Sequence, residues 1–142
     1  MDELQLDHQL CFKLYALSRK VIAVYRPILE ALDITYPQYL VLLVLWEVKS
    51  ITVKELGVRL YLDSGTLTPL LKRLEQKGIL SRQRDIEDER SVVITLKPAG
   101  RSLLQDAKKI PEALGNCISL GQSEYQQLKG RVDKLLTQLT TA

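Results

Sequence analysis

The sequence predicts a mainly α-helical, α+β fold, and three features of the chain support this prediction. Long stretches with apolar residues at helical spacing occupy both ends of the chain. Two helices joined by a very short turn are expected at 53–60 and 63–77. Two strand-like stretches, 79–84 and 91–96, follow with a charged turn between them. We therefore expect a helix-turn-helix followed by a β-hairpin, with longer helices on both flanks.

Size and composition indicate one ordinary globular domain. The chain has 142 residues, of which 46% are hydrophobic and 26% are charged, and domains of roughly 100–200 residues are common. The apolar run at 39–46 is far shorter than the ~20 residues that cross a membrane, and the acidic start does not fit a signal peptide. Two cysteines do not make a disulfide scaffold, so we expect a cytoplasmic protein. The net charge of +3 is too small to indicate nucleic acid by itself.

The first helix is expected from about Leu4–Asp7 to the low thirties, with a bend at Pro27 because proline removes a helical hydrogen bond. This helix carries two adjacent apolar stripes, which exceed what one small core can cover. An exposed seam of this kind predicts a partner helix, most simply from a second copy of the chain. A nearly all-apolar helix follows over 37–48, with Thr35 or Tyr36 at its cap.

The helix at 63–77 carries most of the residues that we expect to contact DNA. Leucines at the spacing of a buried face anchor it, small hydroxyls at its front can approach base edges, and basic side chains can neutralise phosphates. The expected contacts are Ser64, Thr66, Thr68, Lys72 and Arg73. In the hairpin, Arg90 is expected to reach a minor groove, held extended by an ion pair with Asp88. A helical protein with a chance polar face is the alternative, and the order of the elements favours a winged helix-turn-helix.

One cysteine lies on an otherwise apolar face of the first helix. Helical spacing places Cys11 one turn after His8 and one turn before Tyr15. We hypothesise that Cys11 is reactive, although a lone cysteine on such a face is more often an inert core residue. His8 either aids formation of the thiolate or is an interface or solvated residue. One histidine and two distant cysteines give no ligand cluster, so no metal or cofactor is expected.

Two segments, Leu62–Glu75 and Asp85–Arg90, resemble the MarR family of winged-helix repressors. Three further segments resemble the branch of that family that senses organic hydroperoxides, the OhrR-type repressors: Leu10–Phe12, Tyr25–Pro27 and Thr35–Leu42. The resemblance is continuous over about 10–104 and weak afterwards.

The resemblance implies a single MarR-type domain over 1–142 that forms a homodimer. Helices at about 1–35 and 105–142 would form the dimerisation region, and about 36–104 would form the DNA-binding region. Each subunit would place the helix at 63–77 in a major groove of a pseudo-palindromic operator, with the hairpin in the flanking minor groove.

The resemblance also implies roles for individual residues. Cys11 corresponds to the peroxidatic cysteine of the branch, and Tyr25 and Tyr36 correspond to its phenolic partners. Tyr15 matches a further tyrosine that engages the cysteine after oxidation. Cys117 is the candidate resolving thiol; the alternative is an ordinary cysteine, with a small cellular thiol completing the disulfide.

The distance between two of these residues has a structural consequence. Cys11 and Tyr25 are 14 residues apart, which corresponds to ~21 Å along one helix, so they can meet only across a dimer. We expect a repressor that leaves DNA when a hydroperoxide oxidises Cys11 to a sulfenic acid. Two alternatives remain open: a MarR-type repressor released by a noncovalent aromatic or phenolic ligand, and a thiol peroxidase.

Overall fold

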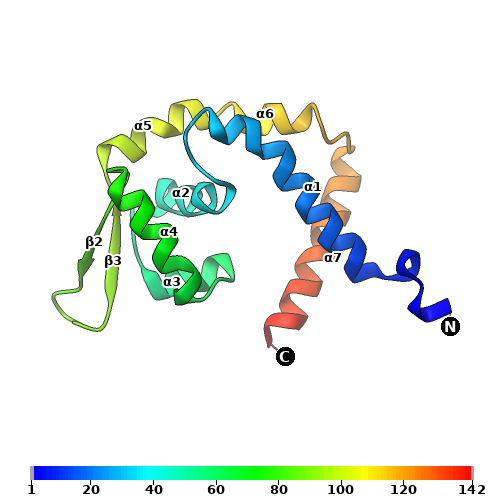
Figure 1. The fold of residues 1–142 in the computed structure, drawn as a ribbon, viewed down its shortest axis with the longest axis horizontal. Coiled ribbons are helices and arrows are strands. Elements are labelled where there is room, and N and C mark those ends of the chain that lie inside the picture. Colours follow the sequence, from blue (N-terminus) through cyan, green and yellow to red (C-terminus); the bar gives the residue numbers. More distant parts are fainter. Residues whose placement is uncertain (1, 142) are drawn as a thin grey trace. The chain divides into compact units, whose positions relative to one another are not determined.

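The computed structural model describes residues 2–141 and contains helices and one small sheet (Figure 1). The chain forms two compact units, Met1–Ile110 and Pro111–Ala142. The mainly helical α+β architecture is the predicted one. In chain order the elements are α1 (Leu10–Glu30), α2 (Tyr36–Val48), β1 (Ser50–Thr52), α3 (Val53–Leu60), α4 (Ser64–Gln76), β2 (Leu80–Arg84), β3 (Val92–Leu96), α5 (Pro98–Ala107), α6 (Ile110–Gly115) and α7 (Gln122–Thr141).

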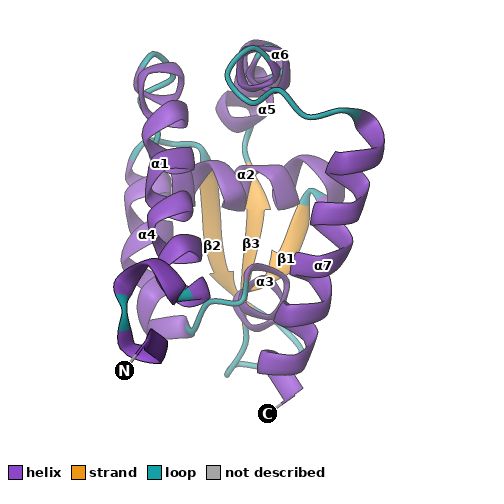
Figure 2. Ribbon diagram, turned by 90° about the vertical axis from the view of Figure 1, so that its right-hand side faces the viewer, coloured by secondary structure: helices purple, strands orange, loops and turns teal. Residues whose placement is uncertain are grey.

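The sheet lies in the first unit and has the strand order β1-β3-β2, with antiparallel neighbours (Figure 2). β2 and β3 form the predicted hairpin. The sequence predicts only a break between helices at 50–53, whereas the structure places β1 there, with Ile51 opposite Ile94 of β3. A strand of three residues is too short to show a period, and its partner is distant in the sequence, so no local pattern indicates this pairing.

The core of the first unit joins α2, α3, α4 and the sheet. α2 is buried on most of its surface, as its nearly all-apolar sequence predicts. The indole Nε1 of Trp46 on α2 donates a hydrogen bond of 2.9 Å to the carbonyl of Gly100, which ties α5 to α2. The largest fully buried side chains are Leu29, Val41, Leu42, Leu45, Leu56, Leu67, Leu71, Leu74, Leu80, Ile94 and Ile110.

Side-chain caps fix where the helices of the first unit begin. At α3, Thr52 and Glu55 form the predicted capping box. At α2, Thr35 is the cap and forms a second capping box with Gln38, whose side chain is buried. Gly78 ends α4 with φ 73°, the left-handed conformation expected of a terminating glycine.

α1 begins at Leu10, later than the predicted start at Leu4–Asp7. Two short 3-10 turns occupy 2–4 and 6–8, and Gln9 interrupts the chain with an extended backbone (φ −88°, ψ 106°). The helix then continues without a break through Pro27 to Glu30. Apolar side chains of its first half stay exposed to solvent: Leu10, Leu14 and Leu17.

The second unit is dominated by α7. Every side chain described on this helix is exposed, including those of Leu128, Leu135 and Leu139. The helix therefore carries an exposed apolar stripe, a feature typical of surfaces that take part in contacts with other proteins.

Candidate functional site

The recognition helix of the helix-turn-helix is α4, and its beginning is set by Asp63. The Asp63 carboxylate accepts a hydrogen bond of 2.7 Å from the backbone N–H of Thr66. This bond lowers the pKa of Asp63 below its ordinary value. Leu67, Leu71 and Leu74 are buried beneath the helix.

The opposite face of α4 presents the polar residues that the sequence predicts. Their side chains are all exposed: Ser64, Thr66, Thr68, Lys72 and Arg73. The Thr68 hydroxyl donates to the Ser64 carbonyl at 2.8 Å, so its oxygen is left as an acceptor toward solvent. Arg73 lies near the far end of the helix and lines an open hollow of about 430 Å³ with Asp33 and Lys77. Ser64, Thr66 and Thr68 therefore lie together at the entering end, and Arg73 lies apart from them.

The wing between β2 and β3 is ordered by hydrogen bonds within the loop. The backbone N–H of Asp85 donates to the Ser91 carbonyl at 2.8 Å, and that of Ser91 donates to the Asp88 carbonyl at 2.9 Å. The Asp88 carboxylate accepts from the backbone N–H of Arg90 at 3.0 Å. Asp88 therefore supports the loop beneath Arg90, whereas the sequence leads us to expect an ion pair with the guanidinium.

A charged clamp joins the recognition helix to the wing. The carboxylate of Glu75 on α4 accepts from the backbone N–H of Arg82 on β2 at 3.1 Å. The same carboxylate forms an ion pair with the Arg82 guanidinium at 3.1 Å. These bonds from Arg82 hold the pKa of Glu75 below its usual range. The pairing of Glu75 with Arg82 is not predicted from the sequence, because the two residues belong to different elements and no local pattern links them.

Cys11 lies in the first turn of α1, and its side chain is exposed. Tyr15, one turn later, is also exposed, and its ring contacts the guanidinium of Arg19 at 5.5 Å from the centroid. Because α1 is one continuous helix from Leu10 to Glu30, Cys11 and Tyr25 of one chain lie at opposite ends of it. Cys11 and Tyr25 therefore do not meet within one chain, as their spacing in the sequence predicts.

Tyr25 and Tyr36 lie together, with ring centroids 4.8 Å apart. Tyr39 contacts both rings at 5.8 and 6.3 Å, and its far side meets Trp46 at 6.3 Å. Burial raises the pKa of Tyr36, and burial together with the neighbouring Tyr36 raises that of Tyr39. Both phenols therefore remain hydrogen-bond donors above the pH at which a free tyrosine ionises. Neither Tyr39 nor Trp46 is predicted from the sequence as a site residue, because both lie in an apolar run that is typical of a helix core.

The remaining predicted residues lie at the two ends of the chain. Cys117 belongs to the second unit, is exposed, and follows α6 in a turn in which its backbone N–H donates to Leu114 at 2.9 Å. His8 lies in a 3-10 turn, with Nδ1 2.8 Å from the Asp2 carbonyl. Within residues 2–141, no group of histidine, cysteine and acidic side chains is arranged to hold a metal ion. No helix described here is both long and apolar enough to cross a membrane.

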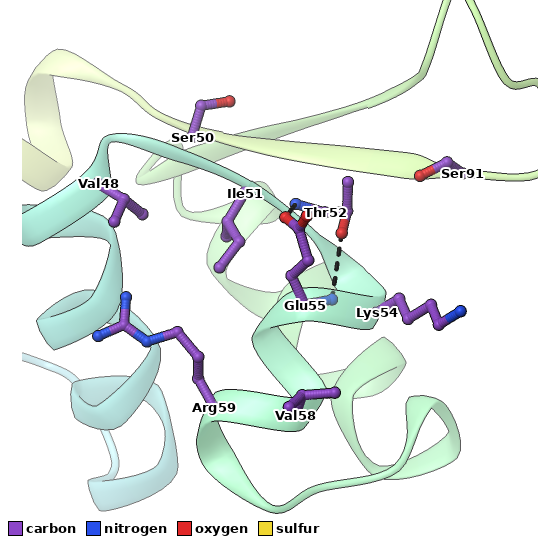
Figure 3. A pocket seen from close by; sticks show the side chains of 9 residues that line it. All are labelled: Val48, Ser50, Ile51, Thr52, Lys54, Glu55, Val58, Arg59 and Ser91. Carbon is purple, nitrogen blue, oxygen red and sulfur yellow. Dashed lines mark hydrogen bonds between the residues drawn. The ribbon is translucent and has the colours of Figure 1, made fainter.

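The outer surface of α3 borders an open hollow of about 770 Å³ that also involves β1 and the base of the wing at Ser91 (Figure 3). Ile51, which is buried, is one of its apolar lining residues. The Arg59 guanidinium at its rim is paired with the carboxylate of Glu47 at 2.7 Å.

Comparison with known proteins places this arrangement in a family. The sequence profile of the SarA/Rot transcriptional regulators matches residues 23–107. The chain is 50% identical over 140 residues to the organic hydroperoxide resistance transcriptional regulator of Bacillus subtilis, a match that covers 99% of this chain and 93% of that protein. The chain also resembles a mutant MarR from E. coli in complex with operator DNA, with 28% sequence identity and a TM-score of 0.78. This match covers 87% of this chain and 90% of the MarR chain. The chain belongs to the MarR family.

AbfR of Staphylococcus epidermidis is a further relative, whose structure is known in several redox forms. Reduced AbfR bound to DNA is 39% identical with a TM-score of 0.82, covering 99% of this chain and 96% of AbfR. The overoxidised form bound to DNA is 38% identical with a TM-score of 0.78, covering 97% of each chain. The disulfide form is 39% identical with a TM-score of 0.62, covering 99% of this chain and 93% of AbfR.

Membership of the MarR family confirms the resemblance drawn from the sequence and the winged helix-turn-helix fold. The chain is a DNA-binding transcriptional regulator and not an enzyme, since its relatives in this family are regulators. The thiol peroxidase alternative is therefore wrong.

Proposed function

We propose that this MarR-family regulator is a repressor that senses organic hydroperoxides through Cys11 and leaves its operator when Cys11 is oxidised. The observation that carries the proposal is the position of Cys11 and Tyr25 at opposite ends of one continuous helix, together with the 4.8 Å contact between Tyr25 and Tyr36. An exposed thiol at one end and a pair of phenols at the other complement each other when two chains pair.

Pairing of two chains is supported by the apolar residues that α1 and α7 expose. Leu10, Leu14 and Leu17 of α1 are 61%, 39% and 54% exposed, which is unusual for aliphatic side chains on one helix face. We propose that about 1–35 and 105–142 form the dimerisation region of a single MarR-type domain and about 36–104 its DNA-binding region. In the dimer, Tyr25 and Tyr36 of one protomer donate hydrogen bonds to Cys11 of its partner.

The chemistry begins with the Cys11 thiolate, whose charge the two phenol donors stabilise. The sulfur attacks the terminal oxygen of the hydroperoxide, a sulfur–oxygen bond forms and the oxygen–oxygen bond breaks. The departing alkoxide takes up a proton and leaves as an alcohol, while the sulfur has lost two electrons and becomes a sulfenic acid. Tyr15, one turn from the new hydroxyl, engages the oxidised side chain.

A second thiol completes the switch, and Cys117 is the candidate. Its sulfur attacks the sulfenic sulfur, the disulfide forms, and the hydroxyl leaves as water. Cys117 is exposed and follows the short helix α6, so its segment is free of the packing that would hold a core cysteine. The disulfide form of AbfR, a relative at 39% identity, supports a disulfide as one end state.

Release of DNA follows if the disulfide changes the spacing of the two recognition helices. Ser64, Thr66 and Thr68 enter a major groove from each protomer of the dimer, Lys72 and Arg73 contact phosphates, and each wing brings Arg90 to the flanking minor groove. Two half-sites one helical turn apart accept only one separation of the helices, about 34–36 Å. A pseudo-palindromic operator is the expected partner.

The test uses the Cys11→Ser variant and an operator duplex recovered by in-vitro selection with the wild-type protein. Both proteins are expected to bind this duplex equally when reduced. One equivalent of cumene hydroperoxide per Cys11 should weaken binding of the wild type by roughly 5–150-fold, the usual range of allosteric coupling. The variant should be insensitive, as measured by fluorescence anisotropy. Full release of Cys11→Ser by the hydroperoxide would show that another group is the sensor.

The matched variant Cys117→Ser separates sensing from resolution. It should consume one equivalent of hydroperoxide and form the sulfenic acid, yet yield no covalent dimer on a non-reducing gel. A covalent species of unchanged yield in Cys117→Ser would exclude Cys117 as the resolving thiol.

A further inference from the structure

The turn between α3 and α4 holds a large aromatic residue in a conformation that favours glycine. Tyr61 has φ 56° and lies in the left-handed region. The turn is closed tightly, since the backbone N–H of Leu62 donates to the Gly57 carbonyl at 3.0 Å, and a Cβ on Gly57 would lie 2.6 Å from the Leu62 carbonyl oxygen. Glycine or asparagine would be easier to accommodate at position 61. Residues held in strained backbone conformations cluster at functional sites, so the side chain of Tyr61 is a candidate for a functional contact.

Tyr61 follows two exposed residues of α3. Lys54 and Val58 are one turn apart on the same face of this helix, and Tyr61 is the residue after its last turn. Val58 is 72% exposed and Tyr61 59% exposed, and within the described chain Lys54 has no ion pair. Figure 3 shows Lys54 and Val58 extending on the same side of α3, away from Arg59, whose charge is taken up by Glu47. We call these three residues the α3 strip.

The α3 strip ends where the recognition helix begins. Tyr61 is followed by Leu62 and then by Asp63, which caps α4. In the chain, the strip is therefore followed closely by Ser64 and Thr66, at the end of α4 that is proposed to enter the major groove. In a helix-turn-helix the first helix crosses the DNA backbone beside that groove. An ammonium, an aliphatic side chain and a phenol match the phosphate, deoxyribose and phosphate of such a strand.

We propose that the α3 strip binds the sugar–phosphate backbone of the DNA strand next to the groove read by α4. Lys54 neutralises one phosphate, the Tyr61 hydroxyl donates to another, and Val58 packs on the deoxyribose between them. The contact fixes the register of the recognition helix and carries no base preference. It rests on DNA binding by α4 and is independent of the redox switch.

The test compares Lys54→Gln and Tyr61→Phe with the reduced wild type, without oxidant, on the selected operator duplex and on a duplex of scrambled sequence. Lys54→Gln should weaken binding to both duplexes by the same factor and reduce the slope of log affinity against log salt by about 1. Tyr61→Phe keeps the backbone and the ring. It should weaken binding to both duplexes about threefold to tenfold, with an unchanged slope, because a neutral donor displaces no counterion.

Lys97→Gln is the matched control. Lys97 is exposed and directly precedes α5, which lies on the opposite side of α2 from α3 in both views (Figures 1 and 2). It should change neither affinity nor slope.

An unchanged slope for Lys54→Gln, wild-type affinity for Tyr61→Phe, or losses confined to the selected duplex would overturn the proposal. A shift of the dimer equilibrium in sedimentation, with DNA binding unaltered, would assign the strip to contact between copies and also overturn it. Release of the wild type by hydroperoxide, measured in the same assay, reports separately on the redox switch.

Discussion

Tyr36 is the residue whose chemistry is most directly testable, because burial raises its pKa and keeps its hydroxyl protonated. Tyr36→Phe removes the hydroxyl and leaves the ring against Tyr25. A hydrogen bond to a charged group contributes about 1.5–3 kcal/mol, so oxidation of Cys11 by cumene hydroperoxide should slow about 10- to 100-fold. Stopped-flow measurement of thiol loss gives the rate, and the affinity of the reduced protein for DNA should not change.

Tyr61→Phe is the matched control for that experiment, because Tyr61 is exposed and lies in the turn after α3, outside the proposed dimerisation region. It should react at the wild-type rate. A wild-type rate for Tyr36→Phe would remove Tyr36 from the proposed contact with the partner's thiolate.

At this scale the sequence predicts which residues face solvent better than what they contact. The 3.6-residue period of the leucines on α4 places Ser64 and Thr66 on the exposed face, as the structure has them. The charges of Asp88 and Arg90 suggest an ion pair between their side chains. In the structure the Asp88 carboxylate instead accepts a hydrogen bond from the backbone N–H of Arg90. Short acidic side chains in turns commonly bond to nearby backbone groups, and this local competition decides the contact.

Among the elements, α4 and β2 are coupled by the Glu75–Arg82 clamp, and this coupling depends on pH. The folded state lowers the pKa of Glu75 below the value of about 4.3 in an unfolded chain. The clamp therefore stabilises the fold above that pH, and its contribution is lost as the pH falls through the lowered pKa. Glu75→Gln should lower the thermal unfolding midpoint by a few degrees at pH 7, and the gap to the wild type should close toward pH 3.

Glu87→Gln serves as a comparison in the same scans, since Glu87 is exposed in the wing and no ion pair involves it in the described chain. A gap between wild type and Glu75→Gln that stays constant from pH 7 to pH 3 would show that the charge of Glu75 does not act through Arg82.

The elements that sequence reasoning recovers are those with strong local signals. The capping box of Thr52 and Glu55 sets the start of α3, and Gly78 sets the end of α4. β1 depends on pairing with β3, and the start of α1 depends on the extended backbone at Gln9. The amphipathic pattern of the sequence indicates neither the β1–β3 pairing nor the later start of α1, because the pattern continues across residues 4–10 without a break.

For the whole molecule, the exposed seam of α1 predicts that stability depends on protein concentration. Leu14→Glu places a charge in the proposed dimer interface, which should weaken dimerisation at least about tenfold, the effect of roughly 1.4 kcal/mol. Analytical ultracentrifugation gives the dissociation constant, and the thermal midpoint of the wild type should rise with concentration.

Ile86→Glu is the control for this variant, because Ile86 at the wing is 98% exposed and distant in sequence from α1. It should leave the dissociation constant unchanged. Equal sedimentation of Leu14→Glu and wild type at every concentration would mean that the seam of α1 does not join two copies. The two apolar stripes of α1 can be recognised in the sequence. The proposed second chain that would cover them cannot, since the periodicity describes a single helix.

The contact of Trp46 with Tyr39 gives the molecule an internal optical reporter. The chain has one tryptophan, and its indole meets the ring of Tyr39 at 6.3 Å while its N–H bonds to Gly100. Light absorbed by Tyr25, Tyr36 or Tyr39 is passed to this one acceptor over short distances. The emission of unlabelled protein should therefore follow any displacement of the phenols or of α5, and the kinetics of oxidation can be recorded without a probe attached to either cysteine.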